Sequence, residues 1–396
     1  MNRNAEPRVL HVTRNLDQGG AQAVLCTLAE SRPAGSEFFV CTLADGPLWP
    51  KLEAAGAQCA MVPGPRCQFS NPVRYASERR RIVRELATVV DEWRIEIVQT
   101  HLLTVLDSAV LRLRRIPHPP AVVWTFHGTD FLPLRPGPTL RLRRLVCRWL
   151  YRATARRVDA IVAVSEAVRD SVVGQLGPAA VRTRVIGNAP SPRKYEPRKR
   201  AGEVRADLGL DSSSRAVLFV GRLAEEKGCR HLVEAVPGLL SRVPGAVTLL
   251  AGHGPDRERL EALARRTGVA SQVRFLGNRD DVADLLAAAD VVCLPSVREG
   301  LSLSLLEAMA AGRPVVASNI AANRALLDDG ITGLLVPPSD PAALARGLIA
   351  ILTDPERAME MAKAARRRAL AEHSPKRQWE LYSALYRDLR SASTWR

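Results

Sequence analysis

The chain has 396 residues, of which 46% are hydrophobic and 25% are charged, a balance typical of a folded globular protein with room for two domains. No apolar run approaches the about 20 residues of a membrane-spanning helix, and the start MNRNAEPRVLHVTR lacks the apolar region of a signal peptide. Seven cysteines without any CxxC pair disfavour a disulfide framework or a zinc site. We therefore expect a cytoplasmic protein with reduced thiols.

The net charge of +16 and the pI near 10.3 indicate attraction to an anionic partner. Nucleic acid, anionic lipid and a phosphorylated substrate are all compatible with that charge. Aromatic residues make up only 5% of the chain, and no RRM, zinc-finger or cold-shock pattern is present. These observations disfavour a basic nucleic-acid-binding protein, and we expect no nucleic-acid partner.

Short apolar runs alternate with helical stretches along both halves of the chain. Runs without polar alternation, each followed by a helix, predict parallel strands that are covered on both faces. The expected fold class is therefore α/β, with two doubly wound Rossmann-like domains facing a cleft. The expected strands are 9–13, 38–44, 95–101, 121–127 and 160–165 in the first half, and 217–222, 247–252, 273–277, 291–296 and 314–318 in the second.

The boundary between the two halves is marked by a change of composition. Residues 188–203, NAPSPRKYEPRKRAGE, are rich in proline and charge and poor in apolar residues, as is typical of a linker. The expected organisation follows the chain in four parts. These are a first domain over 1–190, a linker over 191–214, a second domain over 215–374, and a carboxyl-terminal helix over 375–396.

Two loops have features suited to an anionic ligand. Gly19 and Gly20 follow the first strand and open a helix, where backbone N–H groups and the helix dipole favour negative charge by about 0.3–1 kcal/mol. Glycine pairs are also common in ordinary turns. In the second half, Arg222 and Lys227 share the loop GRLAEEKG after a strand and would suit a diphosphate, although solvated surface charge is the alternative.

Two glutamates bracket the segment EGLSLSLLE in the second half. Glu299 lies on a loop just past a predicted strand, and Glu307 lies in the helix that follows. Glutamates at such a spacing also arise by chance, because Glu is a good helix former. Their position at the carboxyl end of a strand of an open α/β sheet favours a ligand site.

Several nucleotide-binding patterns are absent from the sequence. It has no GxxxxGK[ST] P-loop, no GxGxxG after the first strand and no Asp-x-Asp pair for a divalent metal. A dinucleotide dehydrogenase is thereby disfavoured. We expect no metal and no cofactor, so that side chains and helix ends alone neutralise a diphosphate.

Seven segments occur in order along most of the chain: GGAQ from Gly19, FHGTD from Phe126, VSEAVRDSV from Val164, GRLAEEKG from Gly221, LAGHGP from Leu250, VRFLGNRDDV from Val273 and EGLSLSLLEAMAAGRPVVAS from Glu299. Together they resemble glycosyltransferase family 4, retaining enzymes of the GT-B fold, and the last segment is the most specific. The resemblance implies an activated sugar nucleotide as donor and transfer with retention at the anomeric carbon. It also implies that residues 1–190 bind the acceptor, that residues 215–374 bind the nucleotide sugar, and that the carboxyl-terminal helix over 375–396 returns to the first domain.

The resemblance also implies roles for individual residues. Arg222 and Lys227 would hold the diphosphate as it leaves, Glu299 would accept hydrogen bonds from hydroxyls of the donor sugar, and Glu307 would accept from the ribose. His127 would lie near the transferred sugar. The remaining implied contacts are Gly19 and Gly20 near the phosphates or acceptor, the backbone of Leu301, Ser302 and Leu303 near sugar and phosphate, and Gly277, Asn278 and Arg279 at the base.

Two segments depart from the family pattern. NAPSPRKY from Asn188 stands where Asn-Gly-Val-Asp is usual, and EGLSLS from Glu299 stands where a Phe and a second Gly are common. The departures bear on the hinge and the sugar pocket. No covalent nucleophile is implied; the acceptor would attack on the same face, and the leaving phosphate would take its proton.

The segment Thr139–Arg157 predicts a basic amphipathic helix. Leu145, Trp149 and other apolar residues recur at helical spacing, and arginines from Arg141 to Arg156 occupy another face. Such a helix can lie on an anionic membrane, where each Arg adds about 1 kcal/mol, or it can pack on a core with a solvated Arg face. A lipid-linked acceptor and a peripheral membrane location would fit the first alternative.

The expected function is a hexosyl transfer from a UDP-sugar, or less commonly in the family a GDP-sugar, to a glycan or lipid-linked acceptor in cell-surface polysaccharide or glycolipid synthesis. The alternatives within the same architecture are a sugar phosphorylase, which uses inorganic phosphate as acceptor, and a sugar-nucleotide epimerase. Acceptor choice is expected to reside in loops that include 66–72 and 133–139.

Overall fold

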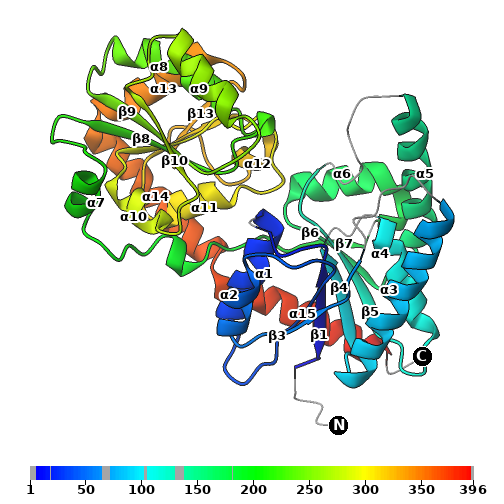
Figure 1. Cartoon of the computed structure of the whole chain (residues 1–396). Coiled ribbons are helices and arrows are strands. Elements are labelled where there is room, and N and C mark those ends of the chain that lie inside the picture. Colours follow the sequence, from blue (N-terminus) through cyan, green and yellow to red (C-terminus); the bar gives the residue numbers. More distant parts are fainter. Residues whose placement is uncertain are drawn as a thin grey trace. The chain divides into compact units, whose positions relative to one another are not determined.

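The computed structural model describes residues 6–17, 19–64, 72–101, 105–129, 138–180 and 182–393 of the chain (Figure 1). The loops expected to choose the acceptor fall largely outside these residues, at 65–71 and 130–137. The chain divides into two compact units. Unit 1 comprises Met1–Asn188 and Pro375–Arg396, and unit 2 comprises Ala189–Ser374.

Unit 1 is built on a seven-stranded sheet in the order β3-β2-β1-β4-β5-β6-β7. Every strand pairing in it is parallel. The central strands are continuous buried runs, as expected for a sheet covered on both faces. The strands are β1 Val9–Thr13, β2 Phe39–Thr42, β3 Gln58–Met61, β4 Ile97–His101, β5 Ala121–Phe126, β6 Ala160–Ala163 and β7 Thr183–Val185.

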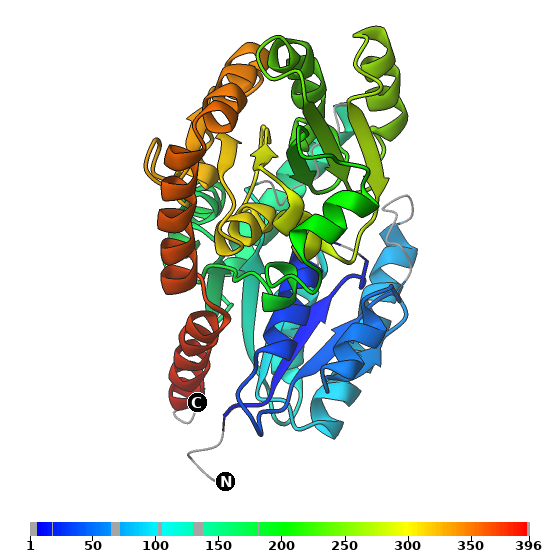
Figure 2. The same cartoon turned by 90° about the vertical axis from the view of Figure 1, so that its left-hand side faces the viewer.

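The carboxyl-terminal helix of the chain belongs to unit 1. The chain leaves unit 2 at Ser374, and α15, red in Figure 2, begins at Pro375. Trp379 donates a hydrogen bond from Nε1 to the carbonyl of Leu28, and Tyr386 is buried against the sheet. The helices of unit 1 are α1 Gly20–Glu30, α2 Trp49–Ala54, α3 Pro72–Glu92, α4 Val105–Val110, α5 Pro138–Ala155, α6 Glu166–Leu176 and α15 Pro375–Ser393, with 3-10 turns η1 Leu111–Arg115 and η2 Gly177–Ala180.

Unit 2 contains a six-stranded parallel sheet in the order β10-β9-β8-β11-β12-β13. From β8 the chain moves outward through β9 to β10, and it then returns to β11 on the other side of β8. The direction of winding therefore reverses between β8 and β11. The strands are β8 Arg215–Val220, β9 Ala246–Ala251, β10 Val273–Gly277, β11 Val291–Leu294, β12 Val315–Ser318 and β13 Leu334–Val336.

Helices cover both faces of the sheet in unit 2. Helix α8 packs against α9 and α13 in one layer, while α11 packs on α14 and α10 packs on α7 in the other (Figure 1). The apolar core lies between these layers and the sheet. The helices are α7 Ala201–Asp207, α8 Cys229–Leu240, α9 Arg257–Arg266, α10 Val282–Ala288, α11 Leu303–Ala310, α12 Ala321–Arg324, α13 Pro341–Thr353 and α14 Pro355–Glu372, with 3-10 turns η3 Pro192–Lys194 and η4 Glu225–Lys227.

The predicted α/β class with parallel sheets is confirmed, and the expected strands coincide with strands of the structure to within a few residues. Three short strands, β3, β7 and β13, lack an expectation from the sequence, and each lies at the edge of its sheet. Residues 191–214, expected as a linker, contain η3 and α7 and are part of unit 2. The N–H groups of Arg198 and Lys199 donate to the carboxylate of Asp284, which ties this polar segment to α10.

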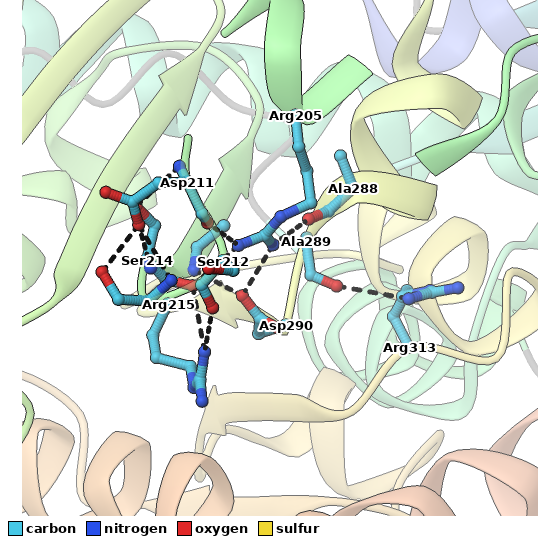
Figure 3. A network of polar contacts seen from close by, with 11 residues as sticks. Arg205, Asp211, Ser212, Ser214, Arg215, Ala288, Ala289, Asp290 and Arg313 are labelled. Carbon is cyan, nitrogen blue, oxygen red and sulfur yellow. Dashed lines mark hydrogen bonds and ion pairs between the residues drawn. The ribbon is translucent and has the colours of Figure 1, made fainter. Parts of the chain in front are cut away.

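A polar network ties α7 to the amino-terminal ends of β8 and β11 (Figure 3). The guanidinium of Arg205 donates to the carbonyls of Ala288, Asp211 and Ser214 and to the carboxylate of Asp290. Asp290 also accepts from the N–H of Ala216 at 2.6 Å. The network lies at the amino-terminal ends of the strands. Ligands of such folds bind at the carboxyl ends, so the role of the network is structural.

Among the residues that the structure describes, no helix combines the length and the apolar content that crossing a membrane requires.

Candidate active site

The reversal between β8 and β11 defines where unit 2 can hold a ligand. In open α/β sheets, the loops that leave two neighbouring strands in opposite directions open a crevice at their carboxyl ends. In unit 2 these loops are 221–228, after β8, and 295–302, after β11. The predicted residues Arg222 and Lys227 lie on the first loop, and Glu299 lies on the second.

The two loops are joined through Lys227 and Glu299. Nζ of Lys227 lies 2.6 Å from Oε1 of Glu299, with side-chain exposures of 25% and 9%. The hydroxyl of Ser296 donates to the same carboxylate oxygen at 2.8 Å. The structure therefore brings these two predicted residues together, and Ser296 orients the carboxylate, a contact that the sequence analysis missed.

The backbone of the two loops also meets closely at Gly228. This residue has φ of +65°, and a Cβ placed on it would lie 2.0 Å from the carbonyl oxygen of Pro295. The N–H of Val297 donates to the carbonyl of Glu226 at 3.0 Å. Only glycine allows both the left-handed conformation and the close approach, and α8 begins immediately after it.

Arg222 is paired within its own loop. Its guanidinium forms an ion pair with Glu226, and its side chain is 63% exposed. Glu226 was missed in the sequence analysis, although its separation of four residues from Arg222 could have indicated the contact. Because one partner is well exposed, the pair holds the guanidinium at the loop while a competing anion can still displace it.

The loops after β9 and β10 lie next to the β8 loop at the carboxyl ends of the strands. The N–H of Gly252 donates to the carbonyl of Gly277 at 2.7 Å. A Cβ on Gly252 would lie 1.8 Å from the carbonyl oxygen of Gly221, so β9 can approach the β8 loop only with glycine there. Gly277 has φ of +68°, and Asn278 beside it is exposed.

Helix α11 begins directly after the β11 loop. Ser302 is its N-cap, and its hydroxyl accepts a hydrogen bond from the N–H of Leu305 at 3.3 Å. The side chains of Leu301 and Ser302 are buried, so any contact of this segment with a ligand is made by backbone. Leu303, the first residue of the helix, is half-buried.

Glu307 lies in the second turn of α11. Burial raises its pKa from 4.5 to about 7, and the nearby Lys194 opposes part of that shift. A carboxyl group whose pKa is raised toward neutral pH, next to a strand's carboxyl end, is a candidate for a ligand site. Lys194, in η3, was not connected with Glu307 by the sequence analysis, because the two residues are far apart in the chain.

The remaining predicted residues belong to unit 1. Gly19 is the N-cap of α1, as predicted, and its carbonyl accepts from the N–H of Ala23. A Cβ on Gly20 would meet no side chain or neighbouring element of the described residues within 4 Å, and Gly20 is exposed. The segment follows β1 and hence lies at the carboxyl edge of its sheet.

His127 directly follows β5 at the same edge. Its Nε2 lies 2.9 Å from Nδ1 of His101, and its own Nδ1 is buried without a hydrogen-bond partner among the described residues. Burial lowers the pKa of His127 to about 4. The histidine is therefore neutral near pH 7, and its contact with His101 was not foreseen from the sequence.

Within the described ranges, no group of three or more His, Cys, Asp and Glu residues is arranged to hold a metal ion. The cations of the β8 loop and the backbone at the start of α11 are the groups of unit 2 that can face an anionic ligand.

Two family models match the chain: "Glycosyltransferase Family 4" over residues 5–192 and "Glycosyl transferases group 1" over residues 201–368. The chain belongs to glycosyltransferase family 4. Its two Rossmann-like units are those of the GT-B fold, and the protein is a glycosyltransferase. The expected family, fold and enzyme class are thereby confirmed.

Two curated relatives illustrate the similarity. An uncharacterised glycosyltransferase of Methanocaldococcus jannaschii is 34% identical over 199 residues, which are 49% of this chain and 51% of that protein. The phosphatidyl-myo-inositol mannosyltransferase of Mycobacterium tuberculosis is 36% identical over 239 residues, 58% of either protein. The chain thus aligns with about half to three fifths of the length of these two relatives.

A solved structure resembles the whole chain. Anabaena HepE in complex with UDP-glucose superposes with a TM-score of 0.79 at 22% identity, covering 96% of this chain and 99% of that one. At this identity the likeness supports the fold.

Proposed function

We propose that this glycosyltransferase moves a hexosyl group from a UDP-sugar to a glycan or lipid-linked acceptor, with retention at the anomeric carbon. The observation that carries the proposal is the Lys227–Glu299 ion pair at the switch point of unit 2, with Arg222 on the loop of Lys227 and Glu307 in the helix that follows the loop of Glu299. These are two cations for a diphosphate and two carboxylates for hydroxyl groups. The choice of uridine rests on the UDP-glucose complex of HepE and on the frequency of UDP-sugars in the family.

In this proposal the leaving diphosphate is stabilised by Arg222 and Lys227. Negative charge grows on the diphosphate as the glycosidic bond breaks, and positioned cations lower the energy of that transition state. The diphosphate competes with Glu226 for Arg222 and with Glu299 for Lys227. Glu299, held by Ser296, then accepts hydrogen bonds from hydroxyls of the donor sugar. The acceptor attacks on the same face, and its proton passes to the leaving phosphate.

The nucleoside end of the donor is assigned to Glu307 and to the loop after β10. Ribose hydroxyls donate to the carboxylate of Glu307, and residues 277–279 border the base. The raised pKa of Glu307 means that the empty site favours the neutral acid below about pH 7. Hydroxyl donors stabilise the ionised form and lower that pKa on binding. No metal and no cofactor take part in the proposed mechanism.

The acceptor is assigned to unit 1. There Gly19 and Gly20 lie near the phosphates or the acceptor, and His127 lies near the transferred sugar, all at the carboxyl ends of the strands. This assignment is supported by the absence of described atoms around a Cβ on Gly20 and by Nδ1 of His127, which has no partner among the described residues. The proposed setting is the synthesis of a cell-surface polysaccharide or glycolipid.

An anionic membrane surface is proposed as the place where a lipid-linked acceptor is met. On α5, Leu145 and Trp149 are 63% and 69% exposed and lie one turn apart, while Tyr151 on the opposite side is buried. Large apolar side chains with this exposure are suited to the boundary between headgroups and acyl chains. The named activity of the mycobacterial relative, on phosphatidyl-myo-inositol, gives this proposal further support.

The arginines of α5 contribute less to the proposed membrane binding than the sequence suggests. Arg148 and Arg152 donate to the carbonyl of Gln175, at the end of α6, so their charges are held beside a helix carboxyl terminus. The side chains of Arg141 and Arg144 lie outside the described residues. The membrane proposal therefore rests mainly on Leu145 and Trp149.

The transfer reaction is tested with purified protein and a panel of UDP-glucose, UDP-galactose, UDP-N-acetylglucosamine and GDP-mannose, with octyl glycosides as acceptors. The expected result is release of UDP together with an α-glycoside, assigned by proton NMR of the anomeric centre. Formation of a sugar 1-phosphate only when inorganic phosphate is added would identify a phosphorylase. Interconversion of sugar nucleotides without transfer would identify an epimerase.

The membrane proposal is tested by sedimentation with vesicles of neutral phosphatidylcholine, with and without about one third phosphatidylglycerol. Replacing both Leu145 and Trp149 by Ser should reduce binding to the anionic vesicles at least tenfold. Met359→Ser is the matched control, because Met359 is a 44% exposed apolar residue on α14. Unchanged binding of the double variant would overturn the proposal.

A further inference from the structure

Three histidines form a continuous hydrogen-bonded line through unit 1. Nδ1 of His11 lies 3.1 Å from Nε2 of His101, and Nδ1 of His101 lies 2.9 Å from Nε2 of His127. His11 belongs to β1, His101 ends β4, and His127 follows β5. The line therefore crosses three adjacent strands and ends at His127, the residue proposed to lie near the transferred sugar.

The parallel register of the sheet produces this line. His11 is paired with Gln99, and His101 is paired with Thr125. His101 lies two residues beyond Gln99 on β4, and His127 lies two residues beyond Thr125, just past the end of β5. Residues two apart on a strand share a face of the sheet. The three side chains therefore lie on one face of the sheet, each closer to the carboxyl ends of the strands than the one before.

The surroundings of the line exclude a charged ring. His11 and His101 are 1% and 2% exposed, and the ring of Phe38 stacks on His11 with centroids 4.6 Å apart. Burial lowers the pKa of His11 to about 3 and that of His127 to about 4. Burial and the two neighbouring histidines also lower the pKa of His101. Each ring therefore carries one N–H near pH 7.

Neutral rings in such a line have only two possible proton arrangements. A neutral imidazole donates from one nitrogen and accepts at the other. If His101 donates from Nδ1 to His127, it must accept at Nε2 from Nδ1 of His11, and all three rings carry the proton on Nδ1. If His101 instead donates from Nε2 to His11, all three rings carry it on Nε2.

The line has two ends, Nδ1 of His127 and Nε2 of His11, and of these two only Nδ1 of His127 is a buried nitrogen without a partner among the described residues. That end distinguishes the two arrangements. The first arrangement leaves a buried N–H without an acceptor there, and the second leaves only a lone pair. Orphaned N–H groups are rarer in proteins than under-used acceptors, so the arrangement with all protons on Nε2 is favoured.

We propose that His101 and His11 are positioning residues that hold His127 in the Nε2-protonated form, with its Nδ1 as a hydrogen-bond acceptor for a substrate hydroxyl. The part of the inference that concerns the substrate rests on the proposed transfer to a hydroxyl acceptor. The order of the protons stands independently of it. His127 is the residue that contacts substrate, while His101 and His11 act through it.

The proton order can be measured directly. Full-length protein labelled with ¹⁵N-histidine is examined by long-range ¹H–¹⁵N correlation at pH 7.5, which reports the protonated nitrogen of each ring. The expected spectrum shows His11, His101 and His127 all protonated on Nε2. Mixed forms among the three rings, or a cationic ring, would overturn the inference without any activity assay.

A variant series then tests positioning. His101→Phe keeps an aromatic ring but removes both hydrogen bonds, so His127 should show both tautomers, and kcat for UDP release should fall at least tenfold with little change in the KM for the donor. His101→Gln, which can both donate and accept, should restore part of kcat. Thr125→Val is the matched control, because it removes the 2.7 Å bond to Gln99 on the same face and leaves the histidines paired.

The outcomes separate this inference from the proposed function. If the three rings show the expected proton order but the protein transfers no sugar, the proposed function is wrong and the proton order stands. Sugar transfer with an unchanged His127 tautomer and unchanged kcat in His101→Phe would remove the positioning role alone. Circular dichroism of each variant establishes that the variant has folded before its kinetics are compared.

Discussion

The Nζ of Lys227 lies 2.6 Å from Oε1 of Glu299, so a single ion pair joins the loops that leave β8 and β11 in opposite directions. In the proposed mechanism Lys227 binds the leaving phosphate and Glu299 binds the donor sugar. The pair therefore keeps two ligand-binding groups oriented at the switch point, and each can exchange its partner for a part of the donor.

Replacing Lys227 by Ala should lower kcat by about 10²–10³, as the loss of one positioned charge donor does in other enzymes. It should also lower thermal stability, because Glu299 is only 9% exposed and loses its cation. The measurement is steady-state UDP release together with calorimetric unfolding. Arg230→Ala is the control, because Arg230 is a 73% exposed cation paired with Glu234 on α8 and should change either quantity little. Wild-type turnover in Lys227→Ala would contradict the assignment.

Gly228 should tolerate no side chain. Gly228→Ala places a Cβ 2.0 Å from the carbonyl oxygen of Pro295, whereas Gly209→Ala meets only a guanidinium nitrogen at 3.9 Å. Both glycines have φ near +60°, so Gly209→Ala measures the conformational cost alone, about 1–2 kcal/mol. We expect Gly228→Ala to lower the free energy of unfolding by more than that and to weaken UDP binding. Equal losses in the two variants would show that the loops are not in close contact.

Glu307 should make stability depend on pH. Its folded pKa of about 7 lies above the ordinary 4.5, so the folded state is penalised as pH rises from 4.5 through 7. The full penalty above pH 7 is up to about 3 kcal/mol. Glu307→Gln should therefore match the wild type near pH 4.5 and be more stable at pH 8. The difference between the two proteins cancels the histidine contributions, and a difference that does not change with pH would exclude the raised pKa.

The network around Arg205 should matter for folding and not for catalysis (Figure 3). Arg205→Ala removes hydrogen bonds to three carbonyls and to Asp290, which should cost about 2–4 kcal/mol of stability. Arg215→Ala is the comparison, since Arg215 is exposed and contacts the carbonyls of Ser212 and Ser214 at 3.3 Å. Calorimetry should show a clear loss for the first variant only. Similar melting of both variants would mean that the network contributes nothing.

The sequence predicts the buried strands well because central strands of a parallel sheet are continuous apolar runs. The edge strand β3 does not show this pattern, because all four of its residues, from Gln58 to Met61, are at least partly exposed. Residues 191–214 look like a linker because they are polar. Their order comes from hydrogen bonds such as those of Asp284 and Arg205, which apolar periodicity does not detect.

The candidate site was predictable where a motif places a residue at a strand end, as for Lys227 and Glu299. Interactions of site residues with distant parts of the chain were not predictable, and the electrostatic effect of Lys194 on Glu307 is an example. The histidine line is the clearest case. Its hydrogen-bonded neighbours are 90 and 26 residues apart in the chain, and only the register of β1, β4 and β5 brings them into contact.

The donor site is tested most directly by calorimetric titration of UDP into the wild type, Glu307→Ala and Arg230→Ala. We expect one site for UDP in the wild type and in Arg230→Ala, with at least tenfold weaker binding in Glu307→Ala. Binding of UDP that is unaffected by the loss of Glu307, or no binding of UDP to the wild type, would contradict the assignment of the donor site to unit 2.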